Sequence, residues 1–392
     1  MILDHVDDEA AFRASVRDWL ARVVLEQPQP TNGEDADAMY EPISRWWMGE
    51  LNKQGLGTPH WPKQYGGVDL NVRLQTILAQ EFARADAPPA SMFNISLNHL
   101  AATLMSWGTE EQKRKYLPGI ATGTVWCQGF SEPGAGSDLA SLHTRAENRG
   151  DHYLINGQKI WSTYAMYADY ALLLARTDPT APKHSGITYF LMNMKDPGVD
   201  MRPIRQVNGK ADFAELFLTD VRIPIEDRVG EEGQGWAVAQ TTLSAERGLL
   251  SLRAAERLRY VMERFQRDSV AEKRAWISEP ELTRQFVKLF ARLQSIRNLM
   301  RDMLLSDHAP ATSGPIMSAS LKVLYSTLRR DWGAFLCEAA GPDAILEDDT
   351  SDDLSGGAQY VYLSSFSLMI GGGTNEIMRN IIAERGLGMP KG

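Results

Sequence analysis

One segment in the first half of the chain is rich in glycine, serine and proline: Phe130-Ser131-Glu132-Pro133-Gly134-Ala135-Gly136-Ser137-Asp138. This composition is unsuited to a helix interior or a central strand, so the segment is predicted to be a loop. The glycines let another molecule approach the backbone closely, and the serine hydroxyls supply hydrogen-bond donors at that surface. The segment is either a small-molecule site or an ordinary surface turn.

Two further segments favour a site. They are Asn156-Gly157-Gln158-Lys159-Ile160-Trp161-Ser162-Thr163 and Gly371-Gly372-Gly373-Thr374-Asn375-Glu376, with Gly233-Gln234-Gly235-Trp236 between them. The segment from Gly371 to Glu376 is predicted to lead into a helix, whose N-terminus presents free N–H groups and a partial positive charge. The plainer alternatives are a core aromatic at Trp161 and an ordinary capped turn before Thr374.

Several kinds of chemistry have no motif in this sequence. There is no Cys/His cluster with zinc spacing, no phosphate-loop lysine motif and no G-x-S-x-G elbow. No metal site is therefore expected. The side chains also offer no two-electron acceptor, so redox chemistry would require a bound cofactor.

Glu246 is the candidate general base. On a predicted helix that begins near Trp236, the residues Ala239, Leu243, Glu246 and Leu250 share one stripe. A carboxylate on an otherwise apolar face is costly to bury, and burial raises its pKa toward that of a useful base. The alternative is a salt bridge to a neighbouring helix.

The three motifs, in this order and at these separations, resemble the acyl-CoA dehydrogenase flavoprotein family. The resemblance extends from the first predicted helix to Arg385-Gly386-Leu387-Gly388-Met389-Pro390, near the end of the chain. It implies FAD as cofactor and the conversion of an acyl-CoA thioester to its trans-2-enoyl-CoA. An electron-transfer flavoprotein would be the external acceptor.

The resemblance also assigns roles to residues of the three motifs. The expected FAD contacts are Gln128, Phe130, Ser131, Trp161, Thr163, Thr374 and Glu376. Ser137 would lie beside the pantetheine-phosphate chain of the substrate or beside the cofactor. The Gly372 N–H would donate to the thioester carbonyl and polarise it for α-deprotonation.

The sequence departs from the commonest family pattern at two places. Many members carry the catalytic glutamate at the position of Gly372, whereas isovaleryl- and long-chain-type members use a Glu-Arg pair, which Glu246-Arg247 matches. The usual adenosine-binding motifs are also missing around Arg264-Phe265-Gln266-Arg267 and Cys337-Glu338-Ala339-Ala340-Gly341. The second departure suggests a heterotetramer with a related subunit in place of a homo-oligomer. Alternatives are a stabilising, non-catalytic subunit and other flavin chemistry, such as an oxidase or monooxygenase.

Composition limits the setting of this chemistry. The chain has 392 residues, 43% hydrophobic and 23% charged, with a net charge of −9. That charge disfavours nucleic acid and anionic lipid as partners. Two cysteines give no disulfide framework, and the acidic N-terminus is unlike a signal peptide. No apolar run is long enough to span a membrane, so a cytoplasmic protein is expected.

Periodicity predicts an α+β fold with three domains. Residues 1–123 are predicted to be helical, residues 124–229 to form an antiparallel β-domain, and residues 230–392 to form a C-terminal helical domain. Thr109 is expected to cap a helix, and Asn156-Gly157 is predicted to be a hairpin turn. The expected strands are Tyr153–Ile155, Ala171–Leu174, Ile187–Leu191 and Leu216–Leu218.

Overall fold

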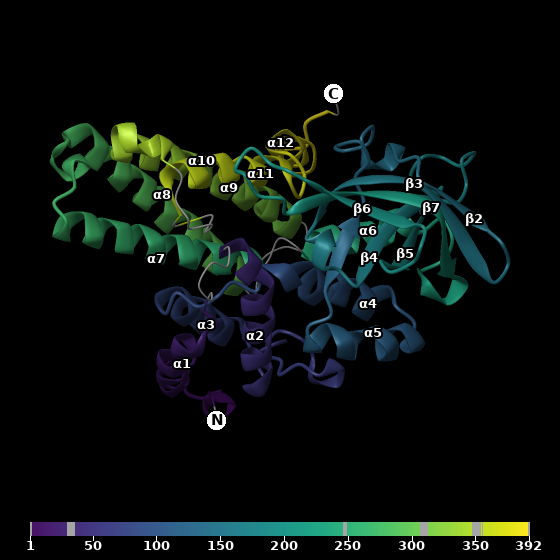
Figure 1. The fold of residues 1–392 in the computed structure, drawn as a ribbon, viewed down its shortest axis with the longest axis horizontal. Coiled ribbons are helices and arrows are strands. Elements are labelled where there is room, and N and C mark those ends of the chain that lie inside the picture. The colour runs from purple at the N-terminus through teal and green to yellow at the C-terminus, as the bar shows by residue number, and fades with distance from the viewer. Residues whose placement is uncertain are drawn as a thin grey trace. The chain divides into compact units, whose positions relative to one another are not determined.

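The computed structural model describes residues 2–29, 36–245, 249–305, 313–346, 354 and 356–390 (Figure 1). They form two compact units. The first unit comprises residues 1–42, 70–88 and 247–392, and the second comprises residues 43–69 and 89–246. The predicted order of helices, sheet and helices is confirmed. The three domain boundaries stay a prediction.

Two N-terminal helices of the first unit begin at side-chain caps. Helix α1 (Glu9–Val23) is capped by Asp8, whose carboxylate accepts the N–H groups of Ala10 and Ala11. Helix α3 (Val72–Arg84) is capped by Asn71, which accepts the N–H of Leu74. These caps satisfy donors that the first turn of a helix leaves free.

The C-terminal part of the first unit is a helical bundle. Its helices are α7 (Leu249–Ala271), α8 (Pro280–Leu305), α9 (Ser313–Ala340), α10 (Ala358–Ser365), α11 (Ser367–Ile370) and α12 (Asn375–Ile381). Helix α8 packs on both α7 and α9, and α10 packs on α9 (Figure 1). Aromatic side chains fill the core, where Phe265 stacks on Trp276 at 5.5 Å and meets the edges of Trp332 and Phe335.

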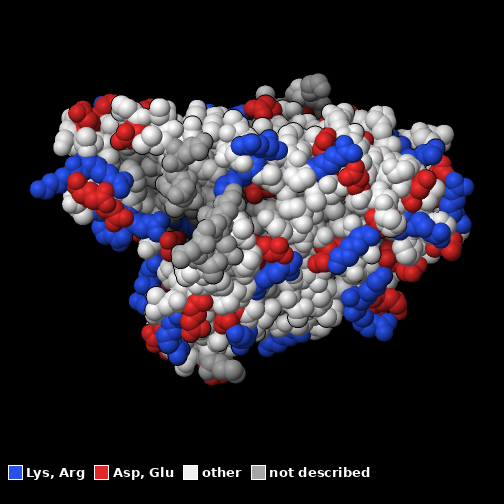
Figure 2. Space-filling view, in the orientation of Figure 1, with Lys and Arg blue, Asp and Glu red and all other residues white. Residues whose placement is uncertain are grey.

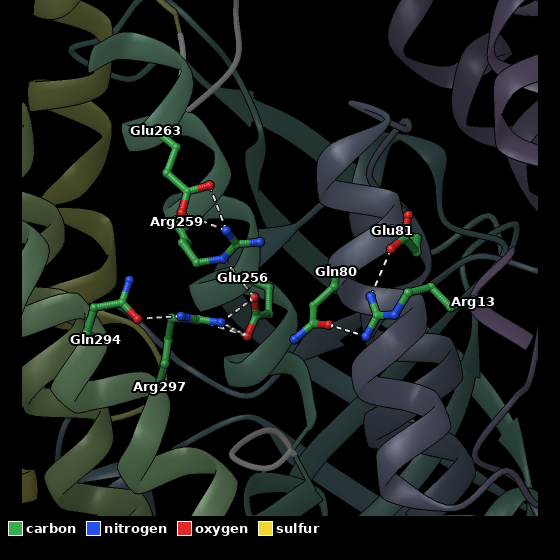
Figure 3. A network of polar contacts seen from close by, with 8 residues as sticks. All are labelled: Arg13, Gln80, Glu81, Glu256, Arg259, Glu263, Gln294 and Arg297. Carbon is green, nitrogen blue, oxygen red and sulfur yellow. Dashed lines mark hydrogen bonds and ion pairs between the residues drawn. The ribbon is translucent and has the colours of Figure 1, made fainter. Parts of the chain in front are cut away.

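A buried polar network crosses from α7 to α8 (Figure 3). The Glu256 side chain is 0% exposed and pairs with Arg297 on α8, whose Nη2 lies 2.7 Å from Oε1. Arg259 also donates to Glu256 at 3.2 Å, and it contacts Glu263 one turn later. Every charge in this cluster therefore has an opposite neighbour.

The helices of the second unit are α2 (Tyr40–Lys53), α4 (Ala101–Trp107), α5 (Glu110–Thr122) and α6 (Gly235–Ala245). A π-helical segment, Ile95–Leu100, leads into α4. The predicted cap of α5 is confirmed: Thr109 and Gln112 form a capping box with each other's backbone N–H. Among the described residues, no helix is long and apolar enough to cross a bilayer.

The sheet belongs to the second unit and has eight strands. They are β1 (Trp126–Gly129), β2 (Arg145–Asn148), β3 (His152–Thr163), β4 (Tyr170–Arg176), β5 (Ile187–Asn193), β6 (Val199–Ile204), β7 (Phe213–Pro224) and β8 (Arg228–Val229). Their order is β6-β7-β3-β2-β4-β5-β8, with β1 paired to β4. Most pairs are antiparallel as predicted, but β1 and β2 each run parallel to β4. The four expected strands are present within β3, β4, β5 and β7.

The predicted hairpin turn at Asn156-Gly157 is wrong. Both residues lie inside β3, where the pairing with β7 shifts register between Ile155 and Gly157. Asn156 exchanges two hydrogen bonds with Asp220 of β7, and a side chain at Gly157 would clash with Thr144. The turn lies earlier, where Gly150 (φ 96°) connects β2 to β3. Asn-Gly here marks a bulge with close backbone approach.

Surface charge of both signs is interspersed. On the face drawn in Figure 2, lysines and arginines alternate with aspartates and glutamates. The net charge of −9 is therefore not gathered into a single acidic area on that face.

Candidate active site

The predicted loop from Phe130 to Asp138 follows β1 directly. Its first turn is closed by two backbone hydrogen bonds between Glu132 and Ala135, at 3.0 and 3.1 Å. Phe130 is buried against Tyr189, whereas Ser131 is half-buried and Ser137 is exposed. A side chain added at Gly134 or Gly136 would meet nothing within 4 Å. These glycines are thus not needed for packing, and they leave open space above the loop.

Strand β3 lies beside this loop and carries the second motif. The Ile160 N–H donates to the Ser131 carbonyl at 2.9 Å, so the loop is attached to β3 one residue before Trp161. The pairing of β3 with β7 shifts register between Lys159 and Ser162. At this bulge Trp161 has φ 62°, a left-handed conformation that is rare for a bulky residue.

The Trp161 side chain is 54% exposed. Its only described ring contact is with the edge of Phe213 at 6.0 Å. The interpretation of Trp161 as a core aromatic is therefore wrong. A bulky residue held in such a strained backbone conformation is more common at functional sites than elsewhere.

The groups around Trp161 fit the flavin that the resemblance implies. Gln128, Ser131 and Thr163 are half-buried and could donate hydrogen bonds to a planar heterocycle. The Ser162 hydroxyl is buried and has no hydrogen-bond partner among the described residues, although buried polar groups are nearly always satisfied. An exposed indole flanked by hydrogen-bond donors suits a ligand with both an aromatic face and polar edges.

A buried ion pair lies under the loop. Lys159 is 0% exposed, and its Nζ donates to Glu132 Oε1 at 2.8 Å and to the Phe130 carbonyl at 3.2 Å. The Glu132 carboxylate also accepts the N–H groups of His143 and Thr144, at 2.6 and 2.8 Å. Burial opposes the charge of Glu132, but Lys159 and these donors hold its pKa below the usual value. Burial lowers the pKa of Lys159 to about 8, and the neighbouring Glu132 carboxylate opposes that shift.

Helix α6 is fixed to the same part of the second unit. The Thr242 hydroxyl lies 2.8 Å from the Thr103 hydroxyl of α4 and 3.2 Å from the Tyr189 hydroxyl of β5. Trp107 donates to Thr241 at 2.9 Å. Tyr189 thus contacts both Phe130, at the start of the loop, and Thr242, which is four residues before Glu246 in the sequence. Glu246 and Arg247 themselves lie outside the described residues.

The third motif belongs to the first unit. Gly372 and Gly373 have φ of 65° and 89°, and they lead to Thr374, which caps α12 by accepting the Ile377 N–H. Asn375 is buried, and its amide oxygen accepts hydrogen bonds from Lys322 and Ser326 of α9, at 2.9 and 3.0 Å. The turn is therefore held by α9, while the Glu376 side chain is exposed.

The structure groups the predicted residues within each unit. Gln128, Phe130, Ser131, Trp161 and Thr163 come together in the second unit, with Ser137 farther along the loop. Gly372, Thr374 and Glu376 share one turn in the first unit. Sequence reasoning assigned no role to Lys159 and Glu132. The alternation along β3 nevertheless indicates that Lys159 is buried, because Lys159 falls on the same face as the buried Tyr153 and Ile155.

Comparison with known families is consistent with this geometry. The chain matches the acyl-CoA dehydrogenase N-terminal domain over residues 6–124, the middle domain over residues 127–221 and the C-terminal domain over residues 233–387. It is 36% identical to acyl-CoA dehydrogenase IpdE1 of Mycobacterium tuberculosis, covering 98% of this chain and 99% of that protein. It is 31% identical to acyl-CoA dehydrogenase FadE26 of the same organism, covering 100% and 99%.

Solved structures give the same result. The ChsE4-ChsE5 complex from Mycobacterium tuberculosis superposes with a TM-score of 0.81 at 30% identity, covering 98% of both chains. The Tcur3481-Tcur3483 steroid ACAD has a TM-score of 0.81 at 31% identity, also over 98% of both chains. With its loop, bulged strand and glycine-rich turn in one continuous match, the chain belongs to the acyl-CoA dehydrogenase family of flavoprotein oxidoreductases.

Proposed function

We propose that Glu246 is the general base that removes the α-proton of an acyl-CoA thioester, and that Arg247 orients its carboxylate. The Gly372 N–H donates to the thioester carbonyl and stabilises the negative charge that develops there as the proton leaves. FAD, when bound, supplies the acceptor for the hydride that leaves the β-carbon. The product is the trans-2-enoyl-CoA, and an electron-transfer flavoprotein serves as the external acceptor.

One observation supports this assignment most directly: Tyr189 contacts both Phe130 and Thr242. The loop proposed to hold the isoalloxazine and the helix that leads toward Glu246 are thereby attached to one rigid strand of the second unit. A general base must lie within hydrogen-bond reach of the proton that it removes. A common anchor for the loop and the helix is what such a geometry requires.

The proposed flavin contacts divide by chemistry. Gln128, Ser131 and Thr163 provide polar contacts, and Trp161 provides an aromatic surface that excludes water. The Phe130 ring is buried against Tyr189, so Phe130 contributes through its backbone. Thr374 and Glu376 of the glycine-rich turn are the remaining cofactor contacts that the family resemblance implies. Ser137, exposed at the far end of the loop, contacts the pantetheine-phosphate chain.

For the substrate, we propose a CoA thioester whose acyl group is bulky, such as a steroid side chain or ring fragment. Support comes from the relatives: the Tcur3481-Tcur3483 structure is described as a steroid ACAD, and it matches nearly the whole chain. Flavin bleaching by a panel of straight-chain, branched and steroid-derived acyl-CoA thioesters tests this. Equal bleaching by short straight-chain thioesters would contradict it.

The base is tested by Glu246→Gln in flavin-loaded protein. Glutamine keeps the shape of the side chain but cannot accept the proton, so anaerobic flavin bleaching by a substrate should slow by about a hundredfold or more. Glu263→Gln is the matched control, because Glu263 is an acidic residue of α7 paired only with Arg259 among the described residues. Wild-type bleaching rates in Glu246→Gln would show that the base lies elsewhere.

We also propose assembly with a related, non-identical subunit. Two observations support this. Arg264 pairs with Asp86 at 2.7 Å and Phe265 lies in the aromatic core of the bundle, so both serve the chain's own fold. In addition, Phe366, Ile370, Leu387 and Met389 are exposed near the C-terminus, and ChsE4-ChsE5 is described as a complex.

A further inference from the structure

The buried pair formed by Lys159 and Glu132 is not explained by stability. A buried ion pair pays a desolvation cost that its own attraction only partly offsets, and apolar replacements of similar volume are often as stable. Lys159 is 0% exposed and Glu132 is 7% exposed. The pair is therefore better understood through the groups that it orders.

Every additional partner of the pair is a backbone group of the loop region. Lys159 Nζ donates to the Phe130 carbonyl, and the Glu132 carboxylate accepts from His143 N and Thr144 N. The pair thus connects three segments: the start of the loop, its return at residues 143–144, and strand β3. Charge-assisted hydrogen bonds of this kind are stronger than neutral ones and fix geometry more tightly.

Arg176 of β4 extends the same arrangement. Its guanidinium donates to the carbonyls of Leu142 and Ala140, at 3.0 and 2.7 Å. The chain between residues 130 and 144 is therefore held from beneath by two cations, Lys159 and Arg176. Its outer part is open at Gly134 and Gly136, where an added side chain would meet nothing within 4 Å.

The pair flanks the two residues that the flavin would meet most closely. Ser131 lies between Phe130 and Glu132, and its carbonyl accepts the N–H of Ile160, the residue after Lys159. Trp161 follows at the bulge, with its backbone in the left-handed region. Releasing Lys159 or Glu132 would free the loop to shift and would let the bulge relax.

We propose that Lys159 and Glu132 are positioning residues of the flavin site, which hold Ser131 and Trp161 in the arrangement that receives the isoalloxazine. This inference rests on the proposed assignment of FAD to these residues. Neither side chain touches the cofactor in this proposal, because both lie beneath the loop. Their effect is to pre-organise the loop, so that binding does not have to order it.

The test is the double variant Lys159→Met/Glu132→Gln, which removes both charges and leaves no unpaired buried ion. Apoprotein is titrated with FAD, and the dissociation constant, the visible spectrum of bound flavin and the thermal midpoint of the apoprotein are measured. We expect the dissociation constant to rise at least about tenfold and the flavin band to lose fine structure, with the apoprotein midpoint close to that of the control.

The matched control is Lys115→Met/Asp227→Asn. Lys115 and Asp227 form an ion pair of the same length, 2.8 Å, in the same unit, and none of their described contacts is with the loop. This control should bind FAD as the wild type does. If the Lys159/Glu132 double variant is folded and binds FAD within about twofold of wild type, with an unchanged spectrum, the proposal is wrong.

If the double variant does not fold, the single variant Glu132→Gln tests the same positioning role. Glutamine keeps an acceptor for Lys159 but weakens the bonds from His143 and Thr144, so FAD affinity should fall by a smaller factor. Unchanged affinity would overturn the proposal. The FAD affinities are measured without substrate, so they do not depend on the proposed reaction. If the proposed function were wrong, the flavin of the wild-type protein would not be bleached by any acyl-CoA, whatever the affinities.

Discussion

Glu81 shows at the scale of one residue how a buried carboxylate is kept charged. Its side chain is 2% exposed and lies within 2.9 Å of Arg13, Arg17 and Arg84. Figure 3 shows Arg13 reaching both Glu81 and the neighbouring Gln80. Burial alone would raise the pKa of Glu81, but the hydrogen bonds from Arg17, Arg84 and Arg13 lower it to about 2.

This shift predicts acid sensitivity of the first unit. Because the folded pKa lies below the ordinary 4.5, the stabilisation is complete above about pH 4.5 and is lost as the pH falls toward 2. The lowering corresponds to roughly 3 kcal/mol. Urea unfolding should therefore show Glu81→Gln to be less stable than wild type at neutral pH, with the difference shrinking near pH ~3.

Glu110→Gln is the control for this measurement, because Glu110 forms an exposed i,i+3 pair with Lys113. It should change stability by less than about 1 kcal/mol. A gap between Glu81→Gln and wild type that is the same at neutral and acidic pH would mean that Glu81 acts through packing alone.

Single residues with local roles could be predicted from the sequence, and those with distant partners could not. The capping role of Thr109 depends on Gln112, three residues away, so the sequence contains the whole interaction. Lys159 and Glu132 are 27 residues apart, and their pairing depends on how β3 lies beside the loop. The exposure of Trp161 likewise follows from a bulge that its own sequence does not encode.

At the scale of elements, long periodic segments were predictable and short ones were not. Helices α1, α3, α8 and α9 lie in the segments 1–123 and 230–392, which apolar spacing predicts to be helical. Strands β1, β2, β6 and β8 were not predicted, because strands of two to six residues carry too little alternation. Asn156-Gly157 was misassigned because hairpin turns and bulges both favour residues that allow close backbone approach.

The contact between α7 and α8 yields a second prediction. Arg297→Met removes the main partner of Glu256 and leaves a carboxylate that is 0% exposed. Glu256 then keeps only its 3.2 Å contact with Arg259. The loss of charge-assisted hydrogen bonds to a buried carboxylate should lower the unfolding free energy by about 1.5–3 kcal/mol. Chemical denaturation of the purified holoprotein measures this.

Arg292→Met is the matched control for that substitution. Arg292 is also an arginine of α8, but its pair with Asp331 of α9 is largely exposed. Its loss should cost less than about 1 kcal/mol. Equal effects of the two substitutions would show that the Glu256 network contributes no more than a surface pair.

At the scale of the whole molecule, the question is what covers the exposed apolar residues near the C-terminus. Ile370 and Leu387 are 66% and 73% exposed, and such side chains are commonly covered by a partner subunit. A related subunit fits the departures from the usual adenosine-binding motifs around Arg264 and Cys337. It also fits the similarity to a structure described as a two-protein complex.

Ile370→Glu tests this assembly. A charge in a subunit interface is costly to desolvate, so the complex should dissociate toward a mass of 43.7 kDa for this chain, measured by light scattering. Val207→Glu is the control, because it places the same charge at an exposed residue of the second unit. It should leave the mass of the complex unchanged. A homotetramer of wild-type chains with one FAD each would reject the heteromeric proposal.

The left-handed backbone at position 161 has an evolutionary consequence. Selection for thermostability alone would favour glycine or asparagine there, since either adopts φ 62° more readily than tryptophan. Directed evolution for heat resistance alone should select those residues, and the selected variants should be colourless because they no longer hold the flavin. Variants that must also keep their yellow colour should retain the indole.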